Sequence, residues 1–212
     1  MNQKANAYTN GAYIGDPAEK SRAQGWQSAA YDASGRNGGL QIEKLRGYGD
    51  DTVLMRFAQM RDRRTGLERH PVSHLASGWW LTEDMFKWLL TRVYGGMGQA
   101  SQNIQKQMLL PPEWNAADCV IKAFPKKGVT LGAWFGRPRS VLTEPGGSQQ
   151  LMQGGGAIQT EEWMYQLYIP GLAGRPHNAR NWLEFEGVYS TQPKPGRALS
   201  YYPCIRPGKR HS

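Results

Sequence analysis

The chain has 212 residues, of which 39% are hydrophobic, and it carries eight Trp, ten Tyr and five Phe. This aromatic content excludes a wholly disordered chain, and no apolar run approaches the roughly 18 residues that a membrane-spanning helix needs. The net charge of +9 does not specify a fold, but it favours a polyanionic partner: nucleic acid, an anionic membrane surface or an acidic protein.

The two ends of the chain differ in composition from its middle. Residues 1–39 are rich in Gly, Ala and polar residues without a hydrophobic period, and the last segment is rich in Pro, Gly and basic residues. We therefore expect a loose N-terminal arm over 1–39, one globular α+β domain over 40–192 and a basic, extended tail over 193–212. The first residues lack the apolar core of a secretory signal, so we expect a cytoplasmic protein with no membrane partner.

Residues 52–74 fit two local structures. Their apolar residues could form a helical stripe, but Asp62 and Gly66 bracket a turn signal and Pro71 ends the run that follows it. These residues favour a β-hairpin whose turn covers 62–66.

Residues 82–94 carry the clearest helix signal. Thr82 is a good N-cap, and the two acidic residues after it lie in the first turn, where the helix dipole favours negative charge. Apolar residues then recur at helical spacing until a glycine pair stops the helix. A second helix is predicted over 99–109, because Pro111 prevents its continuation.

The character of the sequence changes after Pro112. Runs typical of strands cover 119–124, 129–135, 163–169 and 182–189, with turn residues between them. We therefore predict an α+β fold, in which a single domain has a helical N-terminal half, a strand-and-loop-rich C-terminal half and extended termini.

The positive charge is concentrated in the C-terminal part of the chain. Residues 1–118 hold 14 Lys and Arg against 12 Asp and Glu, whereas residues 119–212 hold 12 against 5. No Asp or Glu occurs between 119 and 143. A surface that only needs solubility mixes its charges, so a stretch without carboxylates is typical of a surface that approaches phosphates.

Aromatic residues interleave with the cations of this stretch, among them Phe124, Trp134 and Phe135. Lys and Arg bind phosphates, and exposed rings stack on unpaired bases at roughly 1–3 kcal/mol each. Arg137 and Arg175 each stand between Gly and Pro, which predicts loops that project a guanidinium outward. The alternative is that the aromatics belong to the core and the charges form a solvated face. We expect nucleic acid to be bound by Lys122, Lys126, Lys127, Trp134, Arg137, Arg139, Arg175 and Arg180.

No arrangement of residues predicts a catalytic or metal site. His70 and His74 are four residues apart, but a proline lies between them and the metalloprotease pattern is absent. Two cysteines, Cys119 and Cys204, are too few for a Cys-based zinc site. His177 could serve as a general base in RNA cleavage, although it could equally add to a basic loop. We therefore expect no enzyme, no metal and no cofactor.

Three functions fit these features. The first is a nucleic-acid-binding subunit of a larger nucleoprotein or DNA/RNA-processing complex, with DNA or RNA and other protein subunits as partners. The second is a structural subunit of a large assembly, such as a phage particle or secretion machine, with its termini as straps. The third is a nuclease that uses His177. Retention on heparin with a steep salt dependence favours the first, oligomerisation without nucleic acid the second, and cleavage of an oligonucleotide the third.

Overall fold

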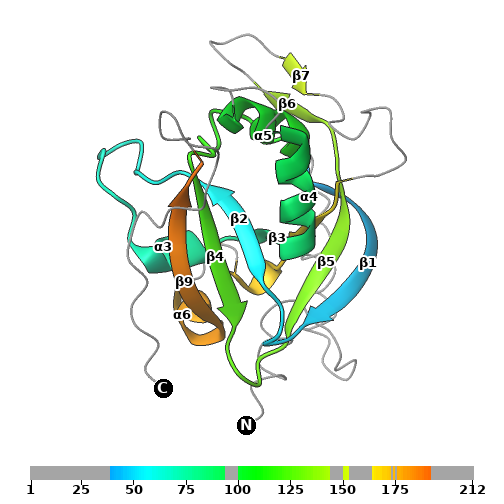
Figure 1. The fold of residues 1–212 in the computed structure, drawn as a ribbon, viewed down its shortest axis with the longest axis vertical. Coiled ribbons are helices and arrows are strands. Elements are labelled where there is room, and N and C mark those ends of the chain that lie inside the picture. The colour runs from blue at the N-terminus through cyan, green and yellow to red at the C-terminus, as the bar shows by residue number, and fades with distance from the viewer. Residues whose placement is uncertain are drawn as a thin grey trace, which may run out of the picture.

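A computed structural model describes residues 39–93, 100–143, 150–152, 164–172, 174 and 176–191. Its seven main strands are β1 (Leu40–Tyr48), β2 (Leu54–Ala58), β3 (Trp79–Thr82), β4 (Cys119–Pro125), β5 (Leu131–Pro138), β8 (Gln166–Tyr168) and β9 (Leu183–Ser190). They form one sheet in the order β1-β5-β8-β3-β2-β4-β9, and all neighbours are antiparallel (Figure 1). A separate hairpin pairs β6 (Val141–Thr143) with β7 (Gln150–Met152).

The predicted helical N-terminal half is wrong. The described chain is mainly a large antiparallel sheet with a few short helices, and β1, β2 and β3 all lie before residue 83. β1 is an edge strand, and its residues Glu43, Lys44 and Arg46 are exposed. Because an edge strand is solvated, it tolerates charged residues and lacks the apolar alternation by which strands are recognised in a sequence.

Helices cover both faces of the sheet. They are α3 (Pro71–Leu75), α4 (Glu83–Val93), α5 (Ala100–Met108) and α6 (Pro176–Trp182), with a 3-10 turn η2 (Pro170–Leu172). One core, which includes Leu54 and Ile121, lies under α3, η2 and α6. The opposite core, which includes Met55 and Val120, lies under α4 and α5. Among the described residues, no helix combines the length and the apolar character needed to cross a bilayer.

The two helices predicted in the first half of the chain are confirmed as α4 and α5. Thr82 Oγ1 accepts a hydrogen bond from Met85 N at 3.4 Å, as expected of an N-cap. The apolar face of α4 packs on the core: Phe86 and Leu89 are exposed by only 1% and 0%, and Met85 and Trp88 are partly buried. α5 ends where Leu109 adopts a positive φ of 50°, shortly before Pro111.

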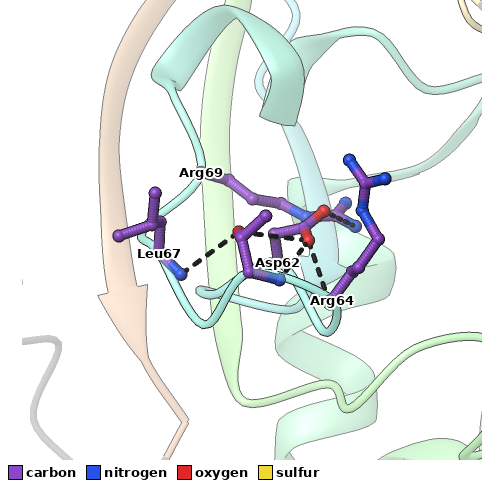
Figure 2. A network of polar contacts seen from close by, with 5 residues as sticks. Asp62, Arg64, Leu67 and Arg69 are labelled. Atoms are coloured by element: carbon purple, nitrogen blue, oxygen red, sulfur yellow. Dashed lines mark hydrogen bonds and ion pairs between the residues drawn. The ribbon is translucent and has the colours of Figure 1, made fainter.

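The turn predicted over 62–66 is present (Figure 2). The Asp62 carboxylate accepts hydrogen bonds from the backbone amides of Arg64 and Thr65, each at 3.0 Å. Gly66 closes the turn with a φ of 69°, a conformation that side chains disfavour. Short polar residues at the first turn position form this type of contact with the backbone two and three residues on.

The second arm of the predicted hairpin is not a strand. After an isolated bridge between Arg61 and Glu68, the chain enters α3. His70 caps this helix, since its Nδ1 accepts a hydrogen bond from Val72 N at 3.2 Å. Pro71 occupies the first helical position, where its missing amide is not needed. Pro71, which the sequence predicts as the end of a strand, therefore begins the helix α3.

The strands predicted after Pro112 are present as β4, β5, β8 and β9, although β8 is shorter than the predicted 163–169. The segment around His177, predicted as a loop, is instead the helix α6. The predicted tail over 193–212 and almost all of the predicted arm over 1–39 fall outside the described residues.

Candidate nucleic-acid interface

Three of the predicted binding residues meet where β4 turns into β5. Lys126 and Lys127 stand in this turn, and the Lys126 ammonium donates to the carbonyl oxygen of Arg180 at 2.8 Å. Arg180 lies in the last turn of α6 and is exposed. We call Lys126, Lys127 and Arg180 the lysine-turn group. Asp50 also reaches this turn, because its carboxylate accepts from Gly128 N at 3.0 Å.

Arg137, predicted in a loop, lies within the last residues of β5, and Arg139 directly follows this strand. Arg137 Nε is 3.1 Å from the Glu43 carboxylate on β1. Arg139 is exposed, and its backbone amide donates to the carbonyl oxygen of Gly39 at 2.9 Å. At a rise of about 3.4 Å per residue, the length of β5 separates these arginines from the lysine-turn group by about 20 Å. These five predicted cations therefore form two groups and not one surface.

Two other predicted residues are engaged within the fold. The Lys122 ammonium is 3.2 Å from the Glu186 carboxylate and lies over the Phe124 ring, 5.5 Å from its centroid. Trp134 is only 6% exposed, so its ring is not available to stack on a base. Arg175 lies outside the described residues.

A partly exposed aromatic pair, Phe135 and Tyr165, lies next to the predicted Trp134. Their half-buried rings are stacked, with centroids 4.5 Å apart and an interplanar angle of 13°. The pairing of β5 with β8 brings them together, because Phe135 is the partner of Leu167. Tyr165 lies two residues before Leu167 and so shares its face of the sheet.

Two cations from β1 complete this surface. Lys44 Nζ and Arg46 Cζ lie over the Phe135 ring, at 5.3 Å and 4.9 Å from its centroid. Each contact is worth roughly 0.5–1 kcal/mol at an exposed site, so the ring holds both cations close to the sheet. Arg137 is two residues beyond Phe135 on the same face. We call Lys44, Arg46, Phe135, Arg137 and Tyr165 the Phe135 platform.

The sequence contained part of the signal for this platform. Phe135 belongs to the aromatics of the acid-free stretch, but alternation alone did not tell whether its ring or that of Trp134 is accessible to solvent. Lys44 and Arg46 are separated by one residue, as expected of two residues on one face of a strand. This signal is missed because the sequence predicts no strand over residues 40–48.

His177, the candidate general base, lies on the exposed surface of the helix α6. Its Nε2 is 2.8 Å from Asn181 Nδ2, one turn further along α6, and both residues are exposed. Within the described ranges, no three His, Cys, Asp or Glu side chains come together as a metal site would require. Comparison with protein-family models, with curated proteins and with solved structures finds no match to this chain.

Proposed function

We propose that this chain is a nucleic-acid-binding subunit, which holds an unpaired strand on the Phe135 platform and contacts its phosphates with the cations around it. The observation that supports this most is the stacked pair of Phe135 and Tyr165, flanked by Lys44 and Arg46 on an edge of the sheet. Rings on a sheet surface stack on bases of any sequence, while nearby cations follow the phosphates. Such a subunit serves within a larger nucleoprotein or nucleic-acid-processing complex.

Charge and stacking make different contributions to this binding, and they can be measured separately. Each phosphate contact to a single strand contributes about 0.7 to the slope of log K against log salt concentration. Stacking of a base contributes roughly 1–3 kcal/mol and leaves the salt slope unchanged. The proposal therefore predicts one signature for Lys44 and Arg46 and another for Phe135.

The test is a fluorescence-anisotropy titration of a labelled oligothymidylate at several salt concentrations. Lys44→Ala with Arg46→Ala should lower the salt slope by about 1.4, or two contacts. Phe135→Leu keeps an apolar side chain against the core and should weaken binding at every salt concentration with the same slope. The matched control is Lys87→Ala with Lys106→Ala, which removes two exposed cations of α4 and α5. Equal losses of slope in both double variants would show that only the net charge matters, and would contradict the proposal.

A structural subunit of a large assembly is the second candidate. Leu142 and Leu151 are cross-strand partners in the β6–β7 hairpin, and they are exposed by 48% and 50%. The hairpin stands off the main sheet at the top of Figure 1. An exposed apolar pair suits contact with a neighbouring subunit. Analytical ultracentrifugation tests this candidate: self-association without nucleic acid, lost in Leu142→Ser with Leu151→Ser, would favour it.

A further inference from the structure

A pocket of about 320 Å³ opens where β2 and β3 separate. The two strands are paired at Leu54 with Thr82 and at Met55 with Leu81. Continuing this register would place Phe57 opposite Trp79, but the strands no longer pair there, and both residues line the pocket.

The gap between the strands is stabilised by side chains that satisfy their backbone. Asn115 Nδ2 donates to the carbonyl oxygen of Phe57 at 3.1 Å. Ser77 Oγ accepts from the backbone amide of Trp79 at 3.2 Å. These side chains replace hydrogen bonds that strand pairing would otherwise make. The opening between β2 and β3 therefore leaves neither of these two backbone groups without a hydrogen bond.

Four aromatic residues stand among the described residues that line the pocket, and its charged residues are cationic. Trp79 packs against the Tyr168 ring, with centroids 4.8 Å apart, and Trp114 is 52% exposed at the rim. Among the described residues that line the pocket, Arg56 and Arg139 are charged and none is acidic. Such a lining favours a planar, π-rich ligand that carries negative charge.

Gln166 supplies a polar group that is fixed in place. Gln166 is only 7% exposed, and its Nε2 donates a hydrogen bond to the carbonyl oxygen of Met108 at 3.0 Å. That bond orients the amide of a residue that lines the pocket. Oε1 therefore offers an acceptor to a ligand with an N–H donor, and every nucleobase carries such a donor on its pairing edge.

We propose that this pocket takes one unpaired nucleobase of the strand bound on the Phe135 platform. The inference rests on the proposed function. Phe135 pairs with Leu167, so its ring and the Gln166 side chain of the pocket lie on opposite faces of the sheet. Arg137 of the platform and Arg139 at the pocket are two residues apart, or about 7 Å along an extended strand, so a nucleic-acid strand that crosses the sheet at this end of β5 can contact both. A volume of about 320 Å³ lies near the lower limit, about 300 Å³, of ligand pockets, and therefore suits a single nucleotide unit.

The test is a scan in which each base of a bound oligonucleotide is replaced in turn by an abasic site. One position should be about tenfold weaker without its base, as expected for a lost stacking contact. In Trp114→Ala the intact strand should bind about tenfold more weakly, and the abasic site at that position should have no further effect. Trp114→Phe should restore the sensitivity. Leu67→Ala removes another exposed apolar side chain, outside the pocket, and serves as the control.

A second readout locates the base directly. An oligonucleotide with 5-iodouracil at the sensitive position should photo-crosslink to the peptide that contains Trp79 or Trp114. Adducts confined to Phe135 and Tyr165, or an abasic penalty that is the same in the parent and in Trp114→Ala, would overturn the pocket while leaving the proposed function intact. If the intact strand does not bind at all, both proposals fail.

Discussion

Arg56 Nη1 donates a hydrogen bond to the carbonyl oxygen of His74 at 2.6 Å and so ties the central strand β2 to the helix α3. Burial lowers the pKa of the Arg56 guanidinium to about 10, which still leaves it charged at neutral pH. Burial, followed by the positive charges of Arg56 and Arg69, lowers the pKa of the His74 imidazole to about 4. Arg56 thus binds the backbone of α3 and also disfavours protonation of the His74 imidazole.

This pair makes the stability of the fold depend on pH. The folded-state pKa of His74 lies below the ordinary value of 6.5, so the unfolded chain takes up the proton first. The free energy of unfolding should therefore fall as the pH drops from about 6.5 toward about 4, by about 2 kcal/mol between pH 7 and pH 5. Urea denaturation of the parent and of His74→Gln measures this. The variant should lose this part of the pH dependence, whereas the exposed His177→Gln should keep it, and parallel curves for all three would contradict the assignment.

Gly78 lies against an aromatic ring that cannot easily move. A Cβ at this position would lie 2.6 Å from Cε2 of Tyr168, which is 7% exposed and packs against Trp79. Gly78→Ala should therefore cost about 1–3 kcal/mol of unfolding free energy and change the near-ultraviolet circular dichroism. The control is Gly66→Ala, where a Cβ would meet no atom within 4 Å but the φ is +69°. That change should destabilise without altering the aromatic signal.

The Asp62 carboxylate should order the 62–66 turn. Hydrogen bonds from the backbone amides of Thr65 and Arg64 lower the pKa of Asp62, so the ionised form is the one that holds the turn. In Asp62→Ala these two amides should lose protection in hydrogen exchange, while the amides of α4 should remain protected. Asp62→Asn keeps an acceptor and should retain part of the protection. Unchanged exchange in Asp62→Ala would mean that the backbone bonds of the turn suffice.

The separation of the lysine-turn group from the Phe135 platform can be tested by strand length. Lys126→Ala with Lys127→Ala should lower the salt slope only for oligonucleotides long enough to reach from the platform to the turn, which lies about 20 Å from Arg137 along β5. For shorter strands the slope should match that of the parent, whereas Lys44→Ala with Arg46→Ala should lower it at every length. If Lys126→Ala with Lys127→Ala lowered the salt slope equally at every oligonucleotide length, the nucleic acid would bind on the lysine-turn group and not on the Phe135 platform.

Local sequence determined the elements whose signals act over a few residues. Thr82 and the acidic residues after it define the start of α4, because an N-cap and the helix dipole act within the first turn. Asp62 and Gly66 define a turn in the same way. The apolar run of β4 predicts a buried strand at whichever position it takes in the sheet.

Only the tertiary structure decided which residues form the platform and the pocket. Strands buried on both faces are apolar at successive positions, so alternation could not show that Trp134 is buried whereas the Phe135 ring, which packs against the core, is partly exposed. Tyr165 reaches Phe135 because β8 pairs with β5, and the charged β1 is a strand because β5 offers it hydrogen bonds. Strand pairing joins residues distant in sequence through backbone groups that every residue carries, so the side-chain pattern does not encode the partner.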